Sequence, residues 1–118
     1  MANPNIAATS SILGRTELQA VGTSATAIAS NGSSSNKVLK VNTLVIANIA
    51  SADVDITVDV FRGGTARRLA NAITIPPNSS LAVLAKENPL YLLEGDDLRL
   101  TASAVSQAEA VCSFEEIA

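Results

Sequence analysis

Histidine and tryptophan are absent from this chain of 118 residues, and cysteine occurs only once. Most acid–base and nucleophilic sites are built around a histidine or a reactive cysteine, so their usual central member is missing here. A single cysteine also excludes an internal disulfide framework and a cysteine-based zinc site. We therefore expect a protein that is not an enzyme and that uses neither a metal nor another cofactor.

Aromatic residues and positive charge are scarce as well. Phe61, Tyr91 and Phe114 are the only aromatic residues, and the formal net charge is −3. The eight basic residues are spread from Arg15 to Arg99 without a long cluster. Because nucleic-acid binding needs a concentrated positive patch and, for single strands, aromatic side chains that stack on bases, we expect no nucleic-acid partner.

Long apolar runs are also missing. The opening M-A-N-P-N-I-A-A-T-S-S has no basic segment and no apolar run of the kind found in signal peptides. No segment approaches the roughly 20 apolar residues that a membrane-spanning helix needs. These features predict a chain that is made in a cytoplasm and has no membrane partner.

Residues 1–11 hold Pro4, two asparagines and small polar residues without a periodic pattern. Such a composition is typical of a disordered tail, but the isolated apolar Ile6 also suits an extended arm that lies along a neighbouring subunit. We therefore separate an N-terminal arm or tail, residues 1–11, from a domain that spans residues 12–118. The candidate interface residues in the arm are Asn3, Pro4, Asn5 and Ile6.

Apolar and polar residues alternate along much of the remaining chain. In the segment 54–62, Val54, Ile56 and Val58 share one parity while Asp55 and Asp59 share the other, which is the pattern of a strand with one buried face. Turn residues separate about eight or nine such short segments. This pattern predicts an all-β fold, a single antiparallel β-sandwich that is jelly-roll-like or immunoglobulin-like.

The clearest pair of predicted strands is 37–49 and 54–62. The short segment Ala50-Ser51-Ala52-Asp53 joins them, which favours a long β-hairpin. The middle of the first strand, Leu44-Val45-Ile46, is apolar on both faces. That composition is expected in a central strand, or in one whose outward face is covered by a partner.

Further interface candidates are four residues at and after the end of the second predicted strand: Phe61, Arg62, Arg67 and Arg68. Phe61 breaks the alternation by placing an aromatic ring on the polar face beside Arg62, just before the turn-forming Gly63-Gly64. The ring either packs under a loop at the strand end or anchors an interface, where phenylalanine and arginine are enriched. Arg67 and Arg68 follow in a segment that is ambiguous between a short strand and a helical turn.

Two motifs carry a resemblance to a known group of proteins. They are Y-L-L-E-G-D-D-L-R at residues 91–99 and the terminal S-F-E-E-I at residues 113–117. With the M-A-N-P-N-I opening and the strands 41–49 and 55–62, they make nearly the whole chain resemble small virion structural proteins of tailed bacteriophages, especially marine and cyanobacterial ones.

The resemblance implies a β-sandwich protein present in many copies on the capsid surface of the virion. It leads us to expect a capsid cement or decoration protein, a homotrimer that binds the major capsid protein or other virion proteins and stabilises the head. A tail, neck or fibre-adaptor component is the alternative. A carbohydrate-binding module is less favoured, because without tryptophan and with one tyrosine the chain has few residues that stack on sugars.

Overall fold

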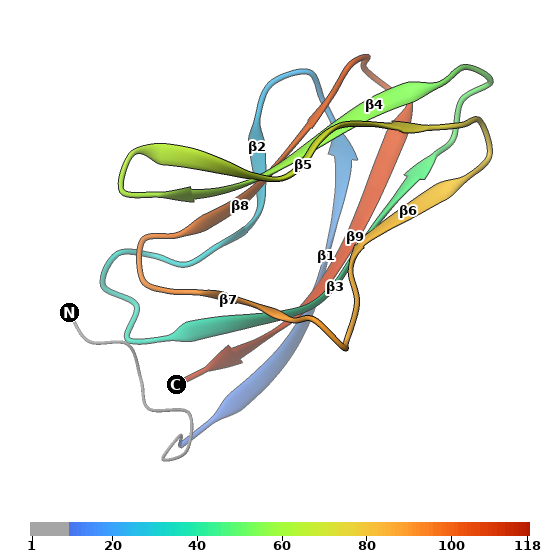
Figure 1. The fold of residues 1–118 in the computed structure, drawn as a ribbon. Helices are drawn as coiled ribbons and strands as arrows, with labels where there is room; N and C mark the ends of the chain where they lie inside the picture. The colour runs from blue at the N-terminus through green and yellow to red at the C-terminus, as the bar shows by residue number, and fades with distance from the viewer. Residues whose placement is uncertain (1–9) are drawn as a thin grey trace.

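Two antiparallel sheets packed face to face make up the part of the protein that the computed structural model describes, residues 10–118 (Figure 1). The candidate interface residues Asn3, Pro4, Asn5 and Ile6 lie outside this range. Within it there is no helix that could cross a membrane. The strands are β1 (Ile12–Val21), β2 (Thr26–Ser30), β3 (Val38–Asn48), β4 (Val54–Arg62), β5 (Thr65–Ile75), β6 (Ser80–Leu84), β7 (Leu90–Leu92), β8 (Asp97–Ala102) and β9 (Ala108–Ile117).

The strand order is that of a jelly roll. The first sheet, here sheet A, runs β1-β9-β3-β6, with β7 also paired to β3, and sheet B runs β2-β8-β4-β5. The strands β6 and β7 pair with successive parts of β3, so they act as one interrupted edge strand. All connections except β4–β5 and β6–β7 pass from one sheet to the other, as in a jelly roll. The predicted antiparallel β-sandwich is confirmed.

The predicted hairpin of the segments 37–49 and 54–62 is wrong. Both segments are strands, but β3 lies in sheet A between β9 and β6, and β4 lies in sheet B between β8 and β5. Each has an apolar face that must be buried. In a sandwich the two faces are buried by packing against each other across the core rather than by pairing side by side.

The hairpin of sheet B is instead β4–β5. Gly63 and Gly64 connect the two strands with φ values of +59° and +80°. Two successive left-handed residues are what the tightest hairpin turn requires, and glycine adopts this conformation without steric cost. The segment after the turn, ambiguous in sequence, is a continuous strand from Thr65 to Ile75.

A β-bulge in β3 decides which of its residues face the core. The register with β9 shifts between Val41 and Thr43, so Asn42 is the extra residue. Before the bulge the buried residues include Leu39 and Val41, and after it they are Leu44, Ile46 and Asn48. A single alternation over 37–49 therefore assigns half of the strand to the wrong face, because one inserted residue exchanges the two faces.

The core lies between the two sheets and is built from small aliphatic side chains. Its largest fully buried hydrophobic members come from both sheets: Leu44, Ile46, Ile56, Ile75, Leu92, Leu98 and Leu100. In β9 the residues Ala108, Ala110, Cys112 and Phe114 face inward, as their shared parity predicts. The sheet surfaces that face away from this core are therefore where contacts with other molecules are available.

Candidate interaction surface

One end of the sandwich is tied together by Asp96, in the turn between β7 and β8. This residue is 1% exposed. The Arg62 Nε donates to Asp96 Oδ1 at 2.8 Å, and the Leu93 amide donates to Oδ2 at 2.8 Å. The backbone amide of Asn31 donates to the backbone carbonyl of Asp96, and the backbone amide of Gly95 donates to the backbone carbonyl of Asn31. These bonds join the β7–β8 turn to the end of β4 and to the loop after β2.

The charge on Asp96 is stabilised despite its burial. Burial by itself raises the pKa of this carboxyl group, but the hydrogen bonds from Arg62 and from the Leu93 amide, with the Arg62 charge, outweigh it and lower the pKa below its ordinary value. Acidic side chains in turns are usually solvated, whereas Asp96 is buried. The physical reason is Arg62, which comes from a strand far away in the sequence.

The candidate residues of the β4–β5 hairpin are largely engaged within the chain. Arg62 binds Asp96, and Arg68 forms an ion pair with Asp59, which is 4% exposed. Phe61 is half-buried, and the centroid of its ring lies 3.6 Å from the Cζ atom of the Arg99 guanidinium, a cation–π contact. Arg67 is exposed, and among residues 10–118 no ion-pair partner is found for it.

The outer face of sheet B is therefore a connected polar surface. Arg99 also binds Asp97 at 3.0 Å, and the Ser30 hydroxyl donates to the same carboxylate. Near the other end of β4, the Thr74 hydroxyl donates to Asp55 at 2.7 Å. Polar groups that already bond to one another gain little from a partner, so this face is a weak candidate for a large contact.

The outer face of sheet A is different, because an apolar row crosses four of its strands. Leu18 of β1 lies opposite Val111 of β9, Val111 opposite Val45 of β3, and Val45 opposite Ala82 of β6. The exposed fractions are 74% for Leu18, 44% for Val111 and 37% for Val45. We call these four residues the apolar row. No described residue buries it, so it is available to a partner.

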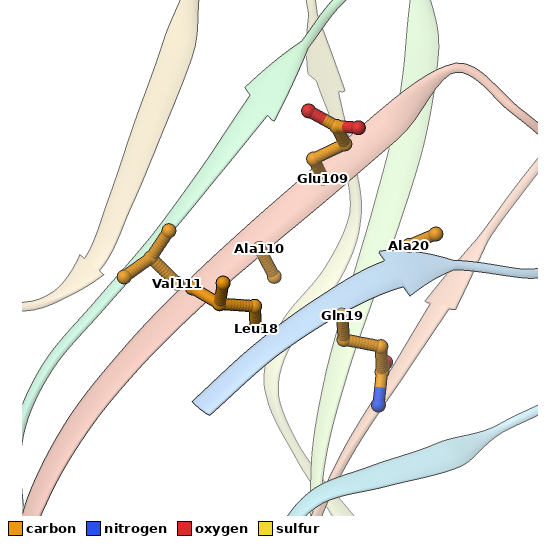
Figure 2. A pocket seen from close by; sticks show the side chains of 6 residues that line it. All are labelled: Leu18, Gln19, Ala20, Glu109, Ala110 and Val111. Carbon is orange, nitrogen blue, oxygen red and sulfur yellow. The ribbon is translucent and has the colours of Figure 1, made fainter. Parts of the chain in front are cut away.

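A shallow depression of about 320 Å³ adjoins the apolar row between β1 and β9. Figure 2 shows Leu18 and Val111 side by side, with Ala20 and Glu109 further along the same two strands. On the other side of the row, Thr16 and Ser113 share a hydrogen bond of 3.0 Å. The row is thus bordered by polar groups at both sides, the arrangement of a small contact surface with an apolar centre.

Cys112 is the nucleophile that the sequence offers, and its surroundings make it inert. The side chain is fully buried in the core. Burial, with a smaller contribution from the Glu17 charge, raises the pKa of the thiol to about 12, so the thiolate is scarce at neutral pH. Among residues 10–118, no group of three or more histidine, cysteine or acidic residues is placed to hold a metal ion.

Sequence reasoning missed the apolar row, although part of its signal was present. Val111 stands on the polar parity of its strand between Glu109 and Ser113, and Val45 lies in a segment that is apolar on both faces. Neither valine alone identifies a surface. The row becomes visible only once the pairing brings residues 18, 45, 82 and 111 into one line.

Comparison with known proteins adds no relative. No protein-family model matches the chain, and no curated protein matches it.

Proposed function

We propose that this chain is a non-enzymatic structural protein of a tailed-bacteriophage particle, a cement or decoration protein that binds major capsid subunits through the outer face of sheet A. The single observation that carries the proposal is the apolar row, Leu18, Val111, Val45 and Ala82, uncovered by the described chain. The assignment to a phage particle and to the major capsid protein as partner comes from the sequence resemblance. The jelly-roll fold is compatible with this role but is used for many others.

Binding in this proposal works through area and shape. Complete burial of a fully exposed valine or leucine is favourable by about 1.5–3 kcal/mol. The three large side chains of the row are 37–74% exposed, so covering each of them contributes a part of that value. A rigid sheet keeps them in one line, so little conformational entropy is lost on docking. On the particle, we expect three copies around each point where capsid subunits meet, an arrangement imposed by the capsid subunits that they bind and not by the association of the free protein.

The contact that we propose does not use the candidates that the sequence offers at the end of β4. Phe61 and Arg62 are held by Arg99 and Asp96 of the same chain, which leaves them less to offer a partner. Arg67 remains exposed and can add a charged contact at the rim of an interface. The apolar row, by contrast, gains its main stabilisation only when something covers it.

The test is co-sedimentation of the purified protein with phage heads that lack it. A Val45→Ser/Val111→Ser variant removes the centre of the apolar row, and we expect its affinity for heads to fall at least about tenfold. Ile73→Ser is the matched control, because Ile73 is 42% exposed but lies in sheet B. Equal binding by both variants contradicts the proposed surface, and binding to tails instead of heads supports the tail or neck alternative.

A further inference from the structure

The first strand, β1, has an unusually regular open edge. Its ten residues pair with β9 in an unbroken register from Ile12 opposite Ile117 to Val21 opposite Ala108. Within residues 10–118, no strand pairs with its other edge, so β1 is one of the two edge strands of sheet A, next to β9 (Figure 1). The other edge strands are short or irregular, since β2 and β6 have five residues each and the pairings of β2, β5 and β6 all contain register shifts. A regular open edge offers unpaired backbone groups to another strand.

We propose that two copies of the free protein associate through antiparallel pairing of β1 with β1, about a two-fold axis at Thr16. In this register Thr16 lies opposite Thr16 of the second copy, and Arg15 of each copy lies opposite Glu17 of the other. The pairing extends sheet A of one copy into sheet A of the other. It is a self-complementary contact of the kind that two-fold dimers use.

Charge complementarity supports this occupant. Arg15 and Glu17 point to the same side of β1, because they lie opposite the inward-facing Phe114 and Cys112. Both line a groove of about 210 Å³ at the mouth of the sandwich between β1 and β2. Within the described residues Glu17 has no ion pair. The second copy's Arg15 supplies one, and the symmetry supplies it twice.

Arg15 is already oriented for this contact. Its guanidinium forms an ion pair with Glu116, whose other oxygen receives the Lys37 ammonium at 3.0 Å. The Arg15 side chain remains 46% exposed. Because a guanidinium has five N–H donors, Arg15 can bind Glu116 and the second copy's Glu17 together.

The same two charges select one register. A shift by two residues in one direction places Arg15 opposite Arg15 of the second copy, and in the other direction it places Glu17 opposite Glu17. Like charges directly opposite each other are destabilising. A shift by one residue would turn the outer face of one copy to the inner side of the other, so that Leu18 and Ile12 would no longer lie on the same face as Gly14 and Ala20 of the second copy. Only the register centred on Thr16 pairs opposite charges.

Side-chain size fits this register on the outer face. Leu18, 74% exposed, lies opposite the second copy's Gly14, and Ile12, 59% exposed, lies opposite the second copy's Ala20. A Cβ atom built at Gly14 would have no atom within 4 Å, so the space beside this residue is open. Each large apolar side chain therefore meets a small residue. The contact covers Ile12 and the side of Leu18 that faces the second copy without a clash, and it leaves Val111 of β9 and Val45 of β3 exposed.

The first test is the mass of the protein by light scattering. Wild-type protein is expected at twice 12.1 kDa, falling to 12.1 kDa on dilution. Glu17→Arg and Arg15→Glu each place like charges opposite one another and are expected to be monomers, whereas their equimolar mixture restores the dimer because every facing pair is then opposite in charge. A monomeric or trimeric wild type, a dimeric single variant, or a mixture that stays monomeric overturns the proposal.

The second test uses cross-linking at the axis and does not depend on charge. Cα atoms of facing residues are about 4.5–5.5 Å apart in an antiparallel pair, within disulfide range, so oxidised Thr16→Cys is expected to give a covalent dimer. Leu18→Cys is the control, because its two copies are separated by about 13 Å along the strands. Equal cross-linking of the two variants, or none at Thr16→Cys, refutes the register. Neither result bears on head binding by Val45 and Val111.

Discussion

Replacing Asp96 with asparagine removes the charge at the centre of the contacts that join one end of the sandwich. The side chain keeps its shape and stays buried, but Arg62 loses a carboxylate that it contacts through two of its nitrogens. The new amide group also has to point a donor at either Arg62 or the Leu93 amide, both of which are donors themselves. The substitution therefore replaces attraction by a conflict between donors.

The magnitude follows from these contacts. A hydrogen bond to a charged group contributes about 1.5–3 kcal/mol, but the Arg62 side chain is 58% exposed, so water replaces part of what it loses. We expect Asp96→Asn to lower the free energy of unfolding by about 2 kcal/mol in total. For a domain of this size that loss lowers Tm by about 8 °C.

The stability difference between wild type and Asp96→Asn should depend on pH in a defined direction. The pKa of Asp96 is lowered in the folded state, so its contribution to stability is complete above the unfolded value of about 3.9 and is lost as the pH falls through the folded value. The stability difference between wild type and Asp96→Asn should therefore be constant near neutral pH and shrink in acid.

Urea denaturation followed by circular dichroism at several pH values measures this difference. Asp53→Asn is the control, because Asp53 is exposed in the turn before β4 and should change stability by less than about 0.5 kcal/mol. If Asp96→Asn costs no more than Asp53→Asn, or if the difference between wild type and Asp96→Asn does not shrink in acid, the buried ion pair does not stabilise the fold as described.

Three further predictions concern the interior and one turn. Asn48→Ala should destabilise by about 2–3 kcal/mol in urea, because the buried Asn48 amide donates to two backbone carbonyls, one of them that of Ile75 at 2.8 Å; a loss below 1 kcal/mol would contradict this. Cys112 should react with a thiol reagent only in denaturant, and rapid reaction of native protein would show that the thiol is accessible. Replacing Gly95, whose φ is +87°, with alanine should destabilise the protein by about 1–2 kcal/mol in thermal melts, because alanine is strained at this φ, and an unchanged Tm would contradict this.

Local features of the fold follow directly from the sequence. The alternation in β4 predicts burial of Val54, Ile56 and Val58, because side chains on one parity of a strand share one face. The turn at Gly63-Gly64 follows from the left-handed conformation that two-residue hairpins require. These properties depend only on neighbouring residues, so periodicity and residue type are sufficient.

Properties that depend on distant residues were not accessible in the same way. The bulge at Asn42 leaves no mark in the residue types around it, yet it exchanges the faces of β3. Asp59 lies on the polar parity of its strand and Asp96 lies in an acidic turn, and only the folded structure places Arg68 and Arg62 beside them. The apolar row likewise depends on strand pairing, because the number of residues between its members has no period.

The contact surface that we propose differs from the sequence candidates for the same reason. Phe61 stands out in a chain with few aromatic residues, but its ring is covered by Arg99 from β8, a strand that its sequence neighbourhood does not reveal. Val111 has no unusual feature in the sequence, yet it lies exposed on the outer face of sheet A. Unusual residue types therefore identified an internal contact, and ordinary valines form the available surface.

Quantitative mass spectrometry of purified phage particles tests the central proposal most directly. The ratio of this chain to the major capsid protein reports whether it covers the head or belongs to a minor component. A cement protein bound at repeated points of the shell should be present in a copy number close to that of the major capsid protein. A few copies per particle, or none, would contradict the account.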